Sequence, residues 1–408
     1  YRGTIWHECW RNPAVGKFSW FLGGDFYYHH ADFCPWRACS QAAEGLGIFS
    51  SAQLFGGFLR NLTVDIAKGI AGVLVIAGHS IAFRYTEGWL LQCSHLGTPL
   101  FIFLSGVFIN IDRPWRESVI RKADRLLKPY FVVLLAMGIM YAVAGKLDPF
   151  SYLVGVFYAT GPTIPLVPLW FLPHLCLCLL TGIAVLQLCR RLKFSRYAYV
   201  LFLLLLLFAG QQCLEFVWQK PLDALWWQSM LRPALHWPGL PWSLDVLPIT
   251  LTLLLAGHVC SPYVKKISFQ WLPLLISALV FLLFIRDGNA AIDINRRIYA
   301  SYFFTSALVF CSIYLLLSFS LIMSNIPLLT NGFSYIGKNF LIILLLHMII
   351  LRMLFIQADK WIPDWRMWHV PLVFLAGLLL SVLLVALVQR SRLLSLLLLP
   401  VKSSGVSH

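Results

Sequence analysis

Residues 65–80 read DIAKGIAGVLVIAGHS, an apolar run interrupted by Asp65, Lys68, His79 and Ser80. Together with its neighbours it has the length of about 20 apolar residues that a bilayer-spanning helix needs. An ionisable side chain inside such a helix costs roughly 2.5 to 3.5 kcal/mol on insertion scales. A predicted membrane helix that carries three of them therefore needs an explanation beyond hydropathy.

The rest of the chain has the composition of a membrane protein. Of its 408 residues, 59% are apolar and only 12% are charged, whereas soluble domains have about 25% charged residues. The net charge of +15 comes from Lys and Arg in short loops between apolar runs, which is the positive-inside pattern of membrane proteins. We therefore predict an all-α polytopic membrane protein, with membrane lipid and not nucleic acid as its surroundings.

The apolar runs predict a bundle of about ten transmembrane helices. They lie near residues 62–83, 90–111, 129–145, 168–189, 197–213, 243–260, 269–286, 300–323, 339–357 and 369–389. Residues 148–160 are too short to span. One set of loops carries 16 Lys and Arg residues and the opposite set nine. The richer side is predicted to be cytoplasmic, so both termini are expected there.

Three regions follow from this division. Residues 59–392 form the predicted transmembrane domain, and residues 393–408 a cytoplasmic tail. Residues 1–58 show no sustained helical or strand period and no signal-peptide layout, so we expect a poorly ordered or non-native extension. Its His and Cys residues match no common zinc spacing, and we predict no metal site.

The polar residues of the first predicted helix share one face. Lys68 and His79 are eleven residues apart, which is three turns plus about 20° and roughly 16 Å along the axis. Asp65 precedes Lys68 by three residues and lies within reach of it, and Gly72 falls on the same stripe. The stripe is interpreted either as a buried Asp–Lys pair with a core histidine, or as a functional row. A transporter or flippase with an Asp-Lys-His proton relay is the alternative function, although we find no convincing inverted repeat.

Several motifs, in order, resemble the integral-membrane acyltransferase 3 family. Its first helix carries Arg, ten residues, then His, and here Lys68 and His79 have that spacing. The further motifs are PLFIFLSGVFI (99–109), RKADRLLKPY (121–130), PLWFLPHL (168–175), PWSLDVLPITLTLLLAGH (241–258) and FSYIGKNFLIILLLH (333–347). Val107 stands where the family usually has Phe. The later motifs look like the branch that includes fucose 4-O-acetylase-like enzymes, and the resemblance covers about residues 60–390.

The resemblance implies a membrane O-acetyltransferase. Such enzymes move an acyl group, usually acetyl from cytoplasmic acetyl-CoA, to a hydroxyl of an envelope or surface carbohydrate. The expected partners are acetyl-CoA as co-substrate and a carbohydrate acceptor. The expected location is a bacterial inner (plasma) membrane.

The donor is expected to meet basic residues. Arg121, Lys122 and Arg125 can pair with its phosphates through charge-assisted hydrogen bonds, and Arg121 and Arg125, four residues apart, share a helix face. Lys68 stands where the family has Arg and would meet the donor inside the bundle. An ammonium lacks the bidentate fork of a guanidinium, so the donor geometry differs from the family's.

His79 is the expected general base. The acceptor hydroxyl must lose its proton as it attacks the thioester, and imidazole is the side chain whose ordinary pKa suits that step near neutrality. Lys68 and Asp65 complete the predicted catalytic set, with Asp65 expected to pair with Lys68 or with the basic segment.

Four further residues are predicted to contact the substrate. They are Ser105, Trp170, Arg296 and Tyr299. Ser105 equally fits a helix-packing role, and Trp170 equally fits an anchor at the membrane interface. The histidines at positions 174, 258 and 347 are interpreted as core or lumen-lining residues.

Overall fold

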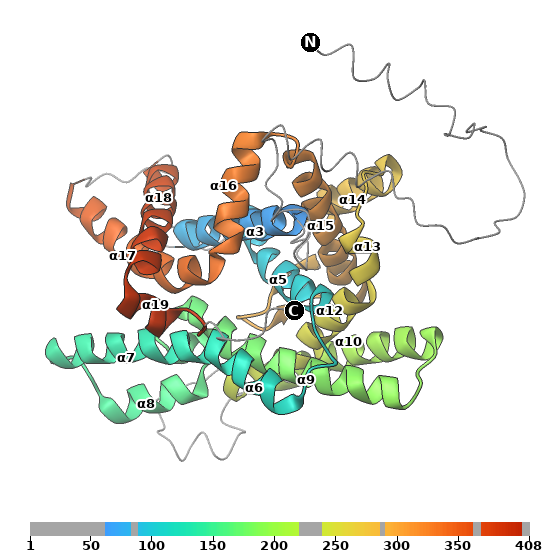
Figure 1. Ribbon diagram of the computed structural model, residues 1–408, viewed down its shortest axis with the longest axis horizontal. Coiled ribbons are helices and arrows are strands. Elements are labelled where there is room, and N and C mark those ends of the chain that lie inside the picture. Colours follow the sequence, from blue (N-terminus) through green and yellow to red (C-terminus); the bar gives the residue numbers. More distant parts are fainter. Residues whose placement is uncertain (1–61, 83–88, 220–238, 286–289, 362–368, 402–408) are drawn as a thin grey trace, which may run out of the picture. The chain divides into compact units, whose positions relative to one another are not determined.

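The computed structural model describes residues 62–82, 89–219, 239–285, 290–361 and 369–401 (Figure 1). The predicted extension at residues 1–58 lies outside these residues, as does the chain after residue 401. Nearly all the described secondary structure is helical. The strands among these residues are β1 (Ile292–Asp293) and β2 (Ile298–Tyr299), which pair in an antiparallel hairpin.

Among the described residues, eight helical segments are long and apolar enough to cross a membrane. Five are single helices: α3 (Leu62–Ala82), α10 (Arg196–Gln219), α15 (Tyr302–Met323), α17 (Phe340–Trp361) and α18 (His369–Arg390). Three are composite: α6 (Trp115–Lys122) with η2 (Ala123–Leu127) and α7 (Lys128–Val143), η4 (Val167–Trp170) with α9 (Phe171–Arg191), and η6 (Pro241–Val246) with α12 (Leu247–Val259). The prediction of an all-α polytopic membrane protein is confirmed.

Two of the ten predicted spans are broken or short. The span expected at 90–111 divides into α4 (Trp89–His95) and α5 (Gly97–Val107), because Pro99 has no N–H for the His95 carbonyl and its ring crowds that oxygen. Helix α14 (Trp271–Phe284) has 14 residues, about 21 Å of helix against roughly 30 Å of hydrocarbon. All ten predicted segments are thus helical, and eight reach spanning length.

Helix α3 lies at the centre of the packing. It contacts α4, α5, α15, α17, α18 and α16 (Pro327–Lys338), and α16 crosses it in Figure 1. A Cβ at Gly69 would overlap the Phe333 carbonyl, and one at Gly337 would overlap the Asp65 carbonyl. Backbones approach this closely only where side chains are absent. These two glycines therefore set the position of α3.

Helices α5 and α12 are joined in the same way. A Cβ at Gly106 would overlap the Leu254 carbonyl, and one at Gly257 would overlap the Phe103 carbonyl. The Ser105–Gly106 pair thus stands where two helices touch, as the packing interpretation of Ser105 expects.

A single π-helical turn, η2, interrupts the segment from α6 to α7. Pro129 follows it and has no N–H to give to the Arg125 carbonyl four residues earlier, which its ring would also crowd. A wider turn relieves that clash. The bulge lies at the basic segment and so sets the direction of Arg125.

The described end of the chain folds back onto α7. Helix α19 (Arg392–Leu398) is followed by two hydrogen bonds to that region. The Lys128 ammonium donates to the Leu399 carbonyl at 2.6 Å, and the Val401 N–H donates to Asp124 at 2.7 Å. The remaining short helices are α8 (Pro149–Tyr158), α13 (Ser261–Lys265) and η3 (Gly161–Thr163).

Candidate active site

Helix α3 carries Lys68 and His79 into two different cavities. Eleven residues of helix separate them by roughly 16 Å. We name the cavities the Lys68 cavity and the His79 cavity after these residues.

The Lys68 cavity has a volume of about 220 Å³ and a strongly cationic lining. Four of its described lining residues carry positive charge and none is acidic: Lys68, Lys122, Arg125 and Lys338. The Lys68 ammonium lies 5.5 Å from the centroid of the Phe108 ring, which attracts a cation to its face. Ser105 also lines this cavity, and its hydroxyl donates to the Phe101 carbonyl at 2.8 Å. This lining favours an anion over a cation.

The His79 cavity, of about 250 Å³, has a mixed lining. Its polar residues include two imidazoles, one carboxylate, one amide and one guanidinium: His79, His95, Asp293, Asn295 and Arg296. Trp170, only 5% exposed, forms an apolar wall. The charges nearly balance, so this cavity suits a neutral ligand with several hydroxyl groups.

The same elements wall both cavities, namely α3, α5, α17 and the junction of η4 with α9. No described residue lines both, and the neighbours Trp170 and Phe171 face different cavities. Phe101 and Phe340 stack at 4.1 Å with their planes 13° apart. A Cβ at Gly72 would lie 2.7 Å from the Phe340 ring, so this stack covers α3 between Lys68 and His79. The Phe101–Phe340 stack belongs to the lining of the Lys68 cavity, on the side of α3 that leads toward His79.

The β1–β2 hairpin supplies a carboxylate that the sequence analysis missed. Asp293 lies 3.5 Å from His95 Nε2 and 3.6 Å from Arg296 Nε, and it accepts the Arg296 N–H at 3.0 Å. The residues come from the stretch AIDINRRIY (291–299), which is unusually polar for this chain. That density of polar residues was the signal available in the sequence.

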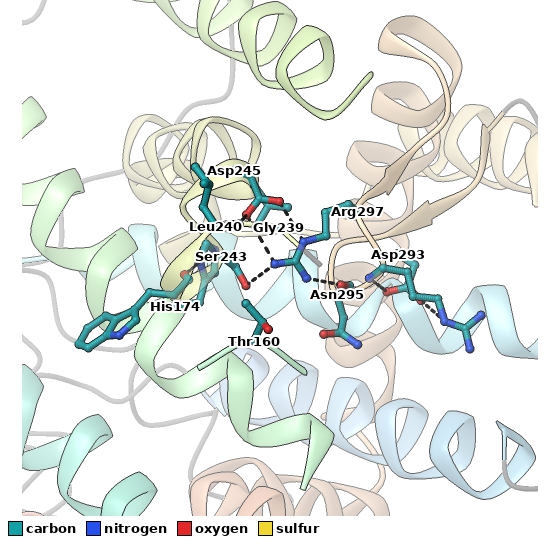
Figure 2. Close-up of polar contacts among 12 residues, drawn as sticks. Thr160, His174, Gly239, Leu240, Ser243, Asp245, Asp293, Asn295 and Arg297 are labelled. Atoms are coloured by element: carbon teal, nitrogen blue, oxygen red, sulfur yellow. Dashed lines mark hydrogen bonds and ion pairs between the residues drawn. The ribbon is translucent and has the colours of Figure 1, made fainter. Parts of the chain in front are cut away.

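A buried ion pair braces the hairpin. Figure 2 shows Arg297 between Asp245, Ser243 and Asn295. Its Nε donates to Asp245 at 2.9 Å, with both side chains fully buried, and its Nη2 donates to Ser243 at 3.0 Å. Its Nη1 donates to the Asn295 carbonyl at 2.6 Å. Removing one partner of such a pair strands a buried charge, so the hairpin is held firmly against η6.

The Asn295 side chain lies beside the His79 cavity and carries a hydrogen-bond acceptor. Its Oδ1 is buried and has no hydrogen-bond partner among the described residues, although the residue lines the His79 cavity. A Cβ at Gly161 would overlap this amide, so Gly161 makes room for it. Buried polar atoms are normally paired, and a ligand hydroxyl in the cavity would pair this one.

His174 is occupied on both ring nitrogens. Its Nδ1 donates to the Trp242 carbonyl at 3.0 Å, and its Nε2 lies 3.0 Å from the Thr250 hydroxyl. The ring packs at 5.5 Å from that of Trp170. It therefore acts as a core residue that supports the tryptophan wall.

A comparison with protein families covers most of the chain. A family model described as an acyltransferase domain, the acyltransferase 3 family, matches residues 61–390, which include both cavities. This chain belongs to that acyltransferase family. Searches of curated proteins and of solved structures found no match.

Three of the predicted site residues of this acyltransferase line neither cavity. Arg121 donates to Glu117, one turn earlier, at 2.7 Å and is turned away from the Lys68 cavity. The Tyr299 hydroxyl pairs with Ser306 at 2.8 Å, and burial raises the pKa of Tyr299 to about 12, so the phenol stays neutral. Asp65 is 2% exposed beneath α16. The other predicted residues divide between the cavities.

The described part of the acyltransferase shows no group of three His, Cys, Asp or Glu residues placed to hold a metal ion.

Proposed function

We propose that this acyltransferase moves an acetyl group from acetyl-CoA to a hydroxyl of a sugar in an envelope or surface polysaccharide. The observation that carries the proposal is the pair of cavities along α3, one cationic and one containing an imidazole. The roughly 16 Å between Lys68 and His79 is similar to the reach of a pantetheine arm.

The Lys68 cavity is the proposed donor site. Its volume of about 220 Å³ is below the roughly 300–1,000 Å³ that encloses a drug-sized ligand, so it suits the narrow arm and leaves the nucleotide at the mouth. There Lys122, Arg125 and Lys338 can pair with phosphates. Loop charge predicts that this end faces the cytoplasm, where acetyl-CoA is made.

The His79 cavity is the proposed acceptor site. Asp293 and the Asn295 Oδ1 can accept hydroxyl protons of a sugar, while Arg296 can donate to its oxygens. His79 takes the proton of the attacking hydroxyl. The acceptor oxygen bonds to the acetyl carbon, the carbon–sulfur bond breaks, and the proton passes from His79 to the sulfur of CoA.

The proposed roles of Lys68 and Asp65 are electrostatic. The Lys68 ammonium stabilises negative charge on the donor as the arm enters the bundle. Asp65, buried one turn earlier on α3, tunes the charge around Lys68.

The test uses cells with and without the protein. Mass spectrometry of their surface glycans is expected to show an added acetyl group only with the protein, and the purified protein in lipid vesicles is expected to bind CoA. Unchanged glycans together with no CoA binding would refute the proposal. Movement of an unmodified sugar across the vesicle membrane would instead support the transporter alternative.

A further inference from the structure

His347, on α17, carries a buried nitrogen without a partner. The side chain is fully buried. Its Nδ1 lies 3.1 Å from the Ile343 carbonyl and 3.0 Å from the Leu344 carbonyl. Its Nε2 has no hydrogen-bond partner among the described residues. An unpaired buried polar atom is destabilising, so the position of this ring needs an explanation.

The contacts of Nδ1 determine the tautomer. A carbonyl oxygen only accepts hydrogen bonds, so Nδ1 carries the proton of the neutral ring. Nε2 then holds a lone pair and is an acceptor. Because Nδ1 is bonded back to its own helix, the Nε2 edge points away from those carbonyls.

The neighbour of this ring is His79. The ring centroids of His79 and His347 are 5.3 Å apart, with planes tilted by 42°. Each ring nitrogen lies about 1.1 Å from its centroid, so nitrogens rotated to face one another would be roughly 3 Å apart, a hydrogen-bonding distance. In this structure the rings are not turned that way, and His347 Nε2 makes no hydrogen bond to His79. His79 lines the His79 cavity and His347 does not, so His347 stands behind the proposed base.

We propose that His347 is a positioning residue for His79. When the rings rotate to bring these nitrogens together, the Nε2 of His347 accepts the N–H of His79, which turns the other, unprotonated nitrogen of His79 toward the acceptor hydroxyl. The inference rests on the proposed function. During transfer His79 gains the hydroxyl proton and becomes a cation with two N–H groups, and His347 stabilises one of them. The proton then leaves from the cavity side to the sulfur of CoA, and His347 gains and loses nothing.

A purely structural role makes the opposite prediction about stability. His347→Leu removes the two Nδ1 hydrogen bonds and the unpaired Nε2 acceptor together. If the ring is held for function, removing the stranded acceptor offsets the lost hydrogen bonds, and the unfolding temperature is unchanged or higher. If the ring is needed for packing, the unfolding temperature falls. His174 is the matched control, because both of its nitrogens are occupied. We expect His174→Leu to lower the unfolding temperature.

The experiment compares the full-length protein with His347→Leu and His347→Gln. We expect kcat for acetyl transfer to fall at least about tenfold in His347→Leu, with KM values for donor and acceptor within about twofold. The Gln side chain offers an acceptor oxygen near the position of Nε2, so His347→Gln is expected to recover part of kcat.

A second measurement does not need turnover. Diethyl pyrocarbonate modifies unprotonated imidazole nitrogens, and mass spectrometry gives the rate at His79. We expect that rate to fall several-fold in His347→Leu and to recover partly in His347→Gln. Unchanged kcat and unchanged His79 reactivity in both variants would overturn the proposal, as would an unfolding temperature that falls in step with activity. If the wild type shows no acetyl transfer but the His79 modification rates change with His347 as expected, the proposed function alone is refuted.

Discussion

The Lys68 cavity and the His79 cavity differ in how they can recognise a ligand. The Lys68 cavity presents four cations and no acid among its described lining residues. In the His79 cavity, a carboxylate and a guanidinium nearly cancel, and imidazole and amide groups supply direction. The Lys68 cavity is therefore expected to select a ligand by its charge, and the His79 cavity by the positions of its hydrogen-bonding atoms.

This difference between the cavities matches a difference in how firmly the surrounding structure holds their lining residues. Coulomb attraction acts over several ångströms and tolerates a flexible ligand, but salt screens it where it is exposed. Hydrogen bonds need fixed partners, and the His79 cavity is braced by the buried Arg297–Asp245 pair. Changes at the Lys68 cavity are thus expected to alter KM and its salt dependence, and changes at the His79 cavity to alter kcat or folding.

The largest effect is expected for His79→Ala. Loss of a general base lowers kcat by about 10²- to 10⁴-fold, while expression and folding stay near normal because the ring faces a cavity. Acetylation of glycans and turnover of purified protein measure it. His258→Ala, which alters a histidine outside both cavities, is the control. Wild-type acetylation in His79→Ala would end the catalytic assignment.

The second-largest effect is expected for the buried Arg297–Asp245 pair that braces the His79 cavity. Arg297→Met strands the Asp245 carboxylate, which is expected to lower the free energy of unfolding by about 3–5 kcal/mol. Arg296→Ala, at the neighbouring position but 59% exposed, is expected to change it by less than about 1 kcal/mol. Thermal or denaturant unfolding in detergent compares the two. Equal stabilities would show that the hairpin is not braced by this pair.

Substitution at the Lys68 cavity is expected to act on donor affinity. Ion pairs at a solvent-open mouth contribute up to about 1 kcal/mol each, so Lys122→Ala with Arg125→Ala is expected to raise KM for acetyl-CoA by about 10- to 100-fold. The salt dependence of KM should weaken in this double variant. Arg121→Ala is the control, since Arg121 is paired with Glu117 outside the cavity. A larger effect from Arg121 than from Arg125 would place the donor elsewhere.

The smallest effects concern the type of cation at position 68. Lys68→Arg introduces the residue that the resemblance to the family places at this position, and it is expected to keep or raise activity. Lys68→Ala is expected to lose about tenfold or more in kcat/KM, equivalent to about 1.4 kcal/mol or more. Steady-state kinetics at fixed acceptor concentration distinguish them. Unchanged kinetics in Lys68→Ala would show that Lys68 only packs beside Phe108.

What could be predicted from the sequence was local. The spacing of Lys68 and His79 depends only on helix geometry, and the helical segments follow from apolar runs. The grouping of His95, Asp293 and Asn295 depends on a hairpin and on a helix broken before Pro99, so no single period reveals it. Arg121 shows that residues on one helix face need not share a site. The spacing of four residues places it beside Arg125, but its side chain pairs with Glu117 instead. The closeness of His347 to His79 was equally hidden, since His347 lies on a helix far along the chain.

The Phe101–Phe340 stack has a consequence for the membrane itself. A polar path that joined the two cavities would be a water-filled leak, through which protons could run down their gradient. The stacked rings of Phe101 and Phe340 pack against Gly72, between Lys68 and His79 on α3. Under the proposed function the donor arm has to pass these rings without letting water follow, so the expected opening is no wider than the arm. We therefore expect the size of the side chain at position 340 to affect the proton permeability of the membrane as well as the transfer reaction.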